Sequence, residues 1–363
     1  MNKCTMIMRS TFVLIAFMLA VLSTHVLAVQ PGRSPVKVFI LAGQSNMEGQ
    51  GRVSEGSRAT LELLVKKDDA GTYQHLVDKD RNWVVRDDVW IYYNRQNNPV
   101  KGGLTIGQGA NSEKFGPELQ IGHILGDFLE NQVLLIKTCW GGKSLAGDFR
   151  PPSSGGQTGK YYKDMLSTVE DVLSHLDTYF PNYKRQGCEI AGFFWWQGWN
   201  DACLGQKAVN EYTDNLANLI RDVRAEWKVP DLAVVIATSG NGGDPPTIKD
   251  GVFMRIHDDL VPAQRAVAKI PEFKTTVAIS ETWDFWRGPK ESPADAGHHW
   301  NDNAESYFQV GTAMGSRMLK LLGGVSSKAP AQDRRPNLLF IMSDDHTAEA
   351  IELKEVMPEQ ASQ

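Results

Sequence analysis

The chain has 363 residues, of which 42% are hydrophobic, 9% aromatic and 22% charged. This composition is typical of a folded globular protein and excludes a disordered or membrane-embedded chain. The formal net charge of −5 gives no basic surface for a nucleic-acid partner, so we expect none.

The N-terminus has the layout of a secretory signal peptide. Lys3 and Arg9 precede an apolar run over residues 11–22, and residues 26–28 offer a cleavage site. The apolar run is shorter than the ~20 residues that span a bilayer. We therefore predict a cleaved signal peptide over residues 1–28, a secreted or periplasmic protein, and no membrane attachment after cleavage.

Five short runs rich in Val, Ile and Phe predict strands that are buried on both faces. They cover residues 36–42, 133–138, 190–196, 233–238 and 275–280. Segments with helical spacing lie between these runs and after the last one: 117–130, 161–180, 209–227, 258–269 and 304–322.

Alternation of strand and helix predicts an α/β fold, a three-layer α/β/α sandwich around a central five-stranded parallel sheet. We expect one domain over residues 29–325. Residues 51–112 are less regular, and we interpret them as a long insertion or an added hairpin near the site. In such sheets ligands bind outside the carboxyl ends of the strands, so the residues after each strand are the candidates for chemistry.

The first strand runs into Gly43-Gln44-Ser45-Asn46-Met47. A serine in a turn is usually a cap or a hydrogen-bonding filler, but this string resembles the first conserved block of the SGNH hydrolases, in the branch of sialate O-acetylesterase-like and acetylxylan esterase proteins. The resemblance extends in separated blocks over about residues 36–322. It implies that Ser45 is the nucleophile, that the fold is the sandwich predicted above, and that Gln44 lies at the substrate.

Paired glycines follow the second strand, where free backbone amides suit an oxyanion hole. Gly142-Lys143-Ser144 matches the end of a phosphate-binding loop, but that motif requires a glycine where Lys137 stands, so we reject it. By resemblance to the second block of the family, Gly142 supplies an oxyanion-hole amide beside that of Ser45.

The third strand ends in a polar turn, residues 197–201. By resemblance to an aromatic-Gln-Gly motif of this esterase branch, Gln197 donates its side-chain amide to the oxyanion. The family commonly continues with Glu-Ser-Asp, whereas this chain has Trp199, Asn200 and Asp201. We expect Trp199 to line the sugar pocket and Asp201 to contribute to substrate binding.

A histidine next to an acid and before a helix fits a general base with an orienting carboxylate. The Asp-x-x-His spacing of these hydrolases selects Asp295 and His298. A His-aromatic-Asn run before the last helix, which resembles a bacterial subset of the family, selects His299. We favour His299 as the base, with Asp295 as the acid in either case. Trp286 and Arg287 follow the last strand, and we expect them to touch the substrate.

Beyond a linker rich in Gly, Ser, Ala and Pro, residues 335–347 resemble the opening strand of type I sulfatases, whose paired aspartates bind calcium. The Cys-x-Pro-x-Arg segment that a sulfatase needs is absent from the sequence. We interpret residues 326–363 as a linker and a truncated sulfatase-like tail without activity.

These observations predict a secreted serine esterase that removes acetyl groups from carbohydrate, such as acetylated xylan or sialic acid, through a Ser-His-Asp acyl-enzyme mechanism. No metal or organic cofactor is required. Two alternatives stay open: a non-catalytic carbohydrate-binding protein on the same fold, and an esterase fused to a sulfatase. Three cysteines follow the signal, so at most one disulfide pair can form.

Overall fold

The structure is a computed structural model in which residues 34–54, 58–95 and 98–323 are described. The predicted signal peptide over residues 1–28 and the predicted tail over residues 326–363 lie outside these ranges. Within them, no helix has the length and apolar character needed to cross a bilayer. Cys139, Cys188 and Cys203 are all free thiols.

The strands are β1 (Val36–Gly43), β2 (Gly51–Arg52), β3 (Arg86–Arg95), β4 (Asn98–Leu104), β5 (Lys114–Phe115), β6 (Val133–Cys139), β7 (Cys188–Trp196), β8 (Ala233–Ala237) and β9 (Val277–Ser280). The α-helices are α1 (Ser45–Glu48), α2 (Leu61–Lys66), α3 (Glu118–Phe128), α4 (Lys160–Ser174), α5 (Leu176–Tyr179), α6 (Trp199–Leu204), α7 (Gln206–Asn210), α8 (Tyr212–Trp227), α9 (Gly251–Arg255), α10 (Val261–Val267) and α11 (Ala304–Leu321). Shorter helical turns are η1 (Gln74–Leu76), η2 (Pro152–Ser154), η3 (Ile256–Leu260), η4 (Pro271–Phe273), η5 (Trp283–Phe285), η6 (Pro289–Glu291) and η7 (Gly297–Asp302).

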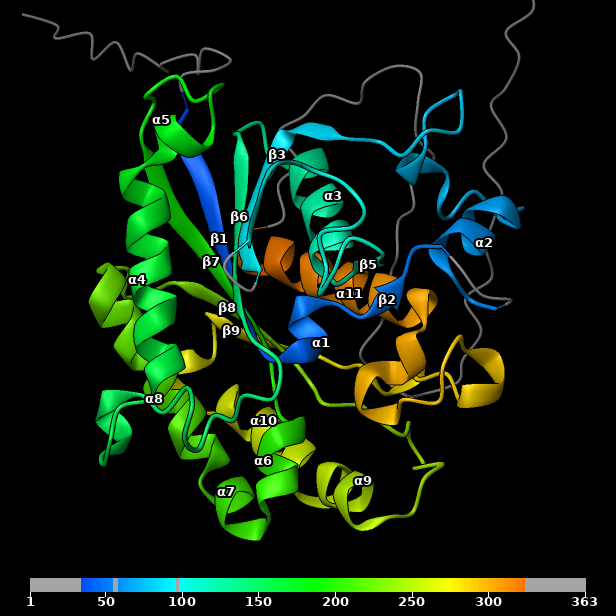
Figure 1. Ribbon diagram of the computed structural model, residues 1–363. Helices are drawn as coiled ribbons and strands as arrows, with labels where there is room; N and C mark the ends of the chain where they lie inside the picture. Colours follow the sequence, from blue (N-terminus) through cyan, green and yellow to red (C-terminus); the bar gives the residue numbers. More distant parts are fainter. Residues whose placement is uncertain (1–33, 55–57, 96–97, 324–363) are drawn as a thin grey trace, which may run out of the picture.

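Seven strands form the central sheet, in the order β4-β3-β6-β1-β7-β8-β9 (Figure 1). The five predicted strands correspond to β1, β6, β7, β8 and β9, and their pairings are all parallel, which confirms the predicted sheet. The other two strands come from the irregular region. β3 pairs in parallel with β6 and antiparallel with β4, so this region adds a hairpin at the edge of the sheet.

Helices cover both faces of the sheet, as Figure 1 shows. One face buries alternate β1 side chains, such as Val38 and Ile40, against α4, α8 and α10. The opposite face buries Phe39 and Leu41 against α3 and α11. Because β1 is apolar on both faces, the three-layer arrangement follows from the period-two placement of its side chains.

Strand β1 lies between β6 and β7 in the sheet. This placement brings together the loops that follow these three strands. Gly43 at the end of β1 pairs with Cys139 of β6 and with Trp196 of β7. A side chain at Gly43 would stand 2.2 Å from the Trp196 carbonyl oxygen, so only glycine fits this close approach. The residues after β1, β6 and β7 therefore emerge side by side.

Candidate active site

Ser45 is the first residue of α1, directly after the carboxyl end of β1, and it is 7% exposed. The preceding residue, Gln44, is buried and bridges to the loop after β7. Its Oε1 accepts from the amides of Gly198 at 3.0 Å and Asn200 at 3.3 Å. Gln44, expected at the substrate, thus uses its side chain inside the protein to hold the Ser45 turn against α6.

The loop after β6 provides the exposed backbone of the site. Gly141 and Gly142 are both exposed, and a side chain at Gly141 would begin 3.8 Å from the Ser45 Cβ. Gly142 has φ +72°, a conformation that favours glycine. Within the described chain, no acceptor is bonded to the Gly142 amide, so this N–H is available to a ligand.

Asp201 holds this loop in place. Its carboxylate accepts from the amides of Leu145 and Ala146, each at 2.8 Å, and from the Gln197 Nε2 at 2.6 Å. Burial raises the pKa of Asp201 to about 6, while the three donors favour the ionised form. The residue is fully buried, and its carboxylate is bonded to these groups of the protein, so its expected role in substrate binding stays a prediction.

The two side-chain amides in the turn after β7 have different environments. Gln197 is 1% exposed, and its Nε2 faces three internal acceptors: Asp201, the Lys143 carbonyl and Gln44. Its Oε1 accepts from the Tyr212 hydroxyl at 3.0 Å. The Gln197 amide is thus used within the protein, and its role toward an oxyanion stays a prediction.

Asn200 is half-buried and has a free donor. Its Oδ1 accepts from the Gln44 Nε2 at 3.1 Å, which turns Nδ2 away from Gln44. The Asn200 Nδ2 lies 3.9 Å from the position that a Cβ on Gly142 would occupy. Among the described residues, no acceptor is bonded to this Nδ2. Sequence reasoning did not single out Asn200, although its place at the start of a helix after a central strand was a usable signal.

The candidate bases lie on η7, next to α1. The Asn46 Nδ2 donates to the His298 carbonyl at 3.2 Å, and the Tyr307 hydroxyl donates to the Asn46 Oδ1 at 2.8 Å. The His299 carbonyl also accepts from Tyr307, at 3.2 Å. The turn that carries both histidines is therefore bonded to the residue that follows Ser45.

The two histidines differ in burial. The His298 side chain is exposed, with its ring centroid 5.9 Å from that of Trp199. His299 is half-buried, and its pKa is lowered to about 4 by burial and by the neighbouring His298. Trp199 also packs on Phe253, at 5.1 Å between ring centroids, so it forms one wall beside His298.

The acid expected beside the histidine was Asp295. Asp295 is exposed, and no hydrogen bond or ion pair of its carboxylate is present among the described residues. Asp302 is the buried carboxylate of the turn, and its charge favours protonation of His299. It lies 3.3 Å from the Arg52 Nε and 3.5 Å from the Lys114 Nζ. Its position three residues after His299 was a signal that sequence reasoning missed.

Three consecutive residues of the turn have left-handed backbone: Trp300, Asn301 and Asp302, with φ of 54°, 56° and 57°. This conformation is unfavourable for residues other than glycine and persists only where the surroundings hold it. Asn301 is fully buried, and its side chain accepts from the Ala296 amide and donates to the Arg287 carbonyl, both at 2.9 Å. These bonds hold the backbone that presents the histidines.

Trp286 and Arg287, expected at the substrate, have partners within the protein. Trp286 is 8% exposed and packs on Trp300, with 5.7 Å between ring centroids. Arg287 pairs with Glu305 at 3.1 Å. These contacts support η7 and the start of α11, and a role toward the substrate stays a prediction.

A buried ion pair supports α1 from the sheet. Lys137 and Glu118 lie 3.0 Å apart with both side chains fully buried. The Lys137 Nζ also donates to the Glu48 carbonyl at 2.7 Å. The Glu48 carboxylate accepts from the Tyr93 hydroxyl at 2.8 Å, and burial raises its pKa. Lys137, which stands where a phosphate-binding loop needs glycine, thus fixes the end of α1.

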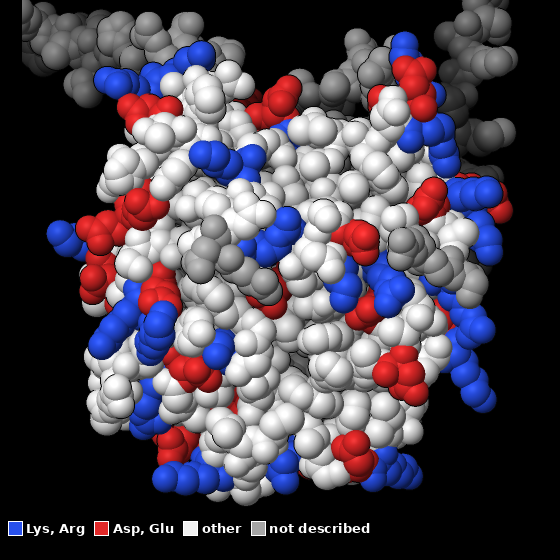
Figure 2. All heavy atoms as spheres, viewed as in Figure 1, with Lys and Arg blue, Asp and Glu red and all other residues white. Residues whose placement is uncertain are grey.

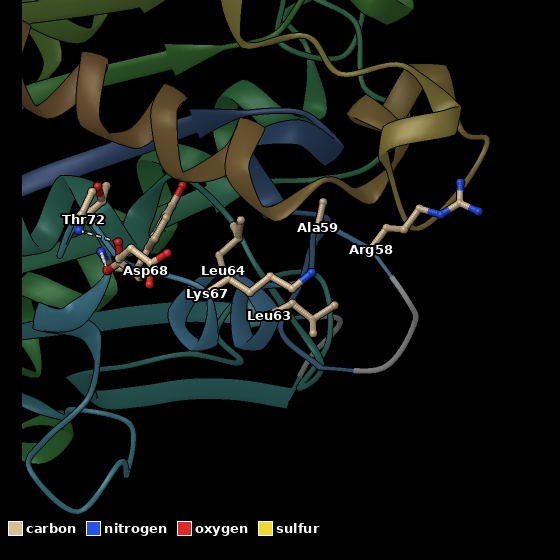
Figure 3. Close-up of a pocket in the computed structure, with 10 residues that line it drawn as sticks. Arg58, Ala59, Leu63, Leu64, Lys67, Asp68 and Thr72 are labelled. Carbon is tan, nitrogen blue, oxygen red and sulfur yellow. Dashed lines mark hydrogen bonds between the residues drawn. The ribbon is translucent and has the colours of Figure 1, made fainter.

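Charged side chains of both signs lie interspersed on the face that Figure 2 shows. A hollow of about 480 Å³ beside α2 is lined by residues such as Arg58, Lys67 and Asp68 (Figure 3). The Asp68 carboxylate there accepts from the backbone amides of Thr72 and Tyr73. None of the residues expected to carry the chemistry lines this hollow.

Comparison with known proteins gives one family match. A family model described as carbohydrate esterase, sialic acid-specific acetylesterase, matches residues 35–319. No curated protein sequence matches.

Several solved structures match this chain at low sequence identity. A protein from Arabidopsis thaliana is 16% identical, with a TM-score of 0.48, over 79% of this chain and 98% of its own. A carbohydrate acetylesterase from Xanthomonas citri is 16% identical, with a TM-score of 0.49, over 80% of this chain and 57% of its own. NanS is 14% identical, with a TM-score of 0.49, over 80% of this chain and 98% of its own.

Proposed function

Because the chain belongs to the carbohydrate esterase family of sialic acid-specific acetylesterases, we propose that it removes acetyl groups from carbohydrates with Ser45 as a covalent nucleophile. One observation carries the proposal. Ser45, the free Gly142 amide and the free Asn200 Nδ2 converge where β1, β6 and β7 end, and Asn46 bonds this point to the turn that carries the histidines.

In the first half-reaction the Ser45 hydroxyl attacks the acetyl carbonyl while histidine accepts its proton. The carbonyl oxygen becomes an oxyanion, and the amides of Ser45 and Gly142 donate to it. Collapse of this intermediate breaks the bond to the sugar oxygen, which receives the proton from histidine. In the second half-reaction water attacks the acetyl-serine, and the same proton transfers release acetate.

For the third oxyanion donor we propose Asn200. The family resemblance assigns this role to Gln197, but the Gln197 amide has three internal acceptors, whereas the Asn200 Nδ2 has none among the described residues. In this scheme Gln197 holds the turn and Asn200 contacts the oxyanion. Each such donor contributes about 10²- to 10³-fold in rate.

For the base we propose His299, which is neutral at pH 7 because its pKa is lowered to about 4. A neutral imidazole can accept the serine proton. Asp302 and Asp295 are the two candidates for the carboxylate that stabilises the imidazolium, and the burial of Asp302 beside His299 supports the former.

The substrate and the location are also proposals. Acetylated xylan and O-acetylated sialic acid are the two substrates to be tested first. The predicted signal peptide supports export to the periplasm or the medium. Mass spectrometry of the N-terminus of the exported protein checks this, since cleavage after Ala28 leaves Val29 first.

The central test is covalent labelling combined with acetate release. Wild-type protein is expected to react with a fluorophosphonate probe at Ser45 and to release acetate from an aryl acetate and from acetylated glycans. Ser45→Ala should lose both reactions with an unchanged circular dichroism spectrum. Turnover at the wild-type rate by folded Ser45→Ala would reject the nucleophile. A folded wild type that binds acetylated glycans without releasing acetate would favour the non-catalytic binding protein.

A further inference from the structure

A second hollow lies beside the proposed active site. Its volume is about 730 Å³, within the range of small-molecule sites in proteins. One wall is the loop from β6 to α4, including Gly147, Asp148 and Arg150. The other wall is the end of α6 and α7, including Leu204 and Lys207. In Figure 1 this loop runs beside α6 and α7 below the carboxyl ends of the strands.

The β6–α4 loop and α6 border the hollow and also carry residues of the proposed active site. The β6–α4 loop carries Gly142 near its start and Gly147 further along. Helix α6 begins at Trp199 and ends at Leu204. Six helical residues extend about 9 Å, so the hollow lies one short helix away from Asn200. A chain bound with one end at Ser45 could continue along this helix into the hollow.

The two walls are bonded to each other. Asp201 of α6 accepts from the amides of Leu145 and Ala146 in the loop, each at 2.8 Å. Arg150 of the loop pairs with Glu211, beyond α7, at 3.1 Å. Both contacts are intramolecular and require no ligand, so the hollow is preformed, which reduces the ordering cost of binding.

The lining suits a sugar chain that carries no net charge. Leu204 is 64% exposed, more than any other large apolar side chain among the described residues, and it offers a surface for the apolar face of a sugar ring. Gln157, Thr158 and Lys207 supply polar groups for hydroxyls. The charges of Arg150 and Lys160 are paired with Glu211 and Asp164, which leaves Lys207 as the one unpaired cation among the described lining residues, too little positive charge to hold a polyanion.

We propose that this hollow is a subsite for a neutral glycan chain, which binds sugar residues beyond the one that carries the acetyl ester. The inference rests on the proposed esterase function and adds to it that the substrate is an oligomer or polymer. The subsite acts through binding alone. It should therefore lower KM for long substrates and leave the chemistry at Ser45 unchanged.

The test uses acetylated xylo-oligosaccharides of two to six residues and a small aryl acetate. Wild type is expected to show a KM that falls as the chain lengthens. The double variant Leu204→Ala/Lys207→Ala should keep wild-type kcat and KM on the aryl acetate. On the longest oligosaccharide its KM should rise about three- to tenfold, which corresponds to about 0.7–1.4 kcal/mol of binding.

A matched control changes the same residue types elsewhere. Leu322 is 40% exposed and Lys320 is exposed, both at the end of α11. Leu322→Ala/Lys320→Ala should match wild type on every substrate. Calorimetry gives a second measurement, the Kd for unacetylated xylohexaose. The triple variant Ser45→Ala/Leu204→Ala/Lys207→Ala should bind it about three- to tenfold more weakly than Ser45→Ala alone.

The outcomes separate the two proposals. If wild type hydrolyses the aryl acetate but its KM does not depend on chain length, or if the double variant matches wild type on the longest chain, the subsite is rejected and the esterase function stands. If wild type releases no acetate from any substrate, the esterase function itself fails.

Discussion

The side-chain amide of Asn46 donates a hydrogen bond of 3.2 Å to the backbone carbonyl of His298. Asn46 follows Ser45 in the chain, whereas His298 lies on the turn before the last helix. The bond therefore links α1, which begins at Ser45, to the turn of the candidate base through a buried side-chain amide and a backbone carbonyl. Tyr307 completes the arrangement, because its hydroxyl donates to the Asn46 Oδ1.

We first predict that Tyr307→Phe lowers kcat more than it raises KM. The hydroxyl is fully buried and bonded to the Asn46 Oδ1 at 2.8 Å and to the His299 carbonyl at 3.2 Å. Loss of this hydroxyl leaves the two acceptors without their donor, which costs about 1–3 kcal/mol of folding stability. The histidine turn is then less well held relative to Ser45. Aryl acetate kinetics at a temperature well below the Tm measure the effect.

Tyr183→Phe serves as the control, since the Tyr183 hydroxyl accepts only from the Gly187 amide, at 3.1 Å, among its described contacts. It should leave kcat unchanged. A Tyr307→Phe enzyme with wild-type kcat would show that the turn is held without this bond.

The second prediction separates the two histidines. His299→Ala should lower kcat/KM by about 10²- to 10⁴-fold, the usual contribution of a general base. His298→Ala should have a much smaller effect, since the His298 side chain is exposed beside Trp199. The reverse order would identify His298 as the base and favour the Asp-x-x-His spacing. Equal, mild losses would place the base elsewhere.

The third prediction concerns pH. The base must be neutral to accept the serine proton, so activity falls as pH drops through its pKa. Burial and the neighbouring His298 and Lys114 lower the pKa of His299 to about 4, while Asp302 acts in the opposite direction. The acid limb of kcat/KM should therefore lie near pH 4, below the pH 6.5 of an ordinary histidine.

Asp302→Asn removes the negative charge that favours protonated His299. The acid limb of kcat/KM should therefore move to still lower pH. Asp295→Asn, at the exposed carboxylate, provides the comparison. An acid limb that moves with Asp295→Asn and not with Asp302→Asn would identify Asp295 as the orienting acid.

The fourth prediction separates rate from stability at the turn after β7. Asn200→Ala should lower kcat by about 10²- to 10³-fold with a smaller loss of Tm than Gln197→Ala, because it removes the free Nδ2 donor and only one internal side-chain bond, from the Gln44 Nε2. Gln197→Ala should lower Tm more, since it removes a buried side chain, takes one of three donors from the Asp201 carboxylate and breaks the bond between the Tyr212 hydroxyl and the Gln197 Oε1. A stable Gln197→Ala protein with a large loss of kcat would restore the oxyanion role to Gln197.

Parts of the fold were predictable from sequence because strands buried on both faces of a parallel sheet are continuous apolar runs. All five of these runs became strands. Strands β3 and β4 lie in the region interpreted as a long insertion or an added hairpin, and they were not predicted individually for a physical reason. β4, the edge strand, includes Pro99 and two glycines, which are unfavourable in a central strand and acceptable at an edge. β3, next to it, includes Asp87 and Asp88, which lie where its pairing with β4 is irregular.

At the site, too, the place of each segment in the sheet decides what could be predicted from sequence. The Ser45 turn and the paired glycines follow central strands, so their position at the carboxyl edge could be expected. Trp286 and Arg287 also follow a strand, but β9 is the edge strand, and its loop supports the histidine turn. The left-handed backbone of residues 300–302 depends on bonds from Asn301 to distant backbone groups, which no local pattern predicts.

The last prediction is that deletion of residues 326–363 leaves esterase activity and thermal stability nearly unchanged. The seven-stranded sheet and every residue proposed for the chemistry lie within residues 34–323. Helix α11 ends at Leu321, after it has packed its apolar face, including Met314 and Met318, against the sheet. The core of the domain is thus closed before the deletion begins. Unfolding temperatures and aryl acetate kinetics of the full and shortened proteins make the comparison. A fall in Tm of more than several degrees, or a loss of solubility, would show that the deleted segment packs on the domain and that the boundary at residue 325 is wrong.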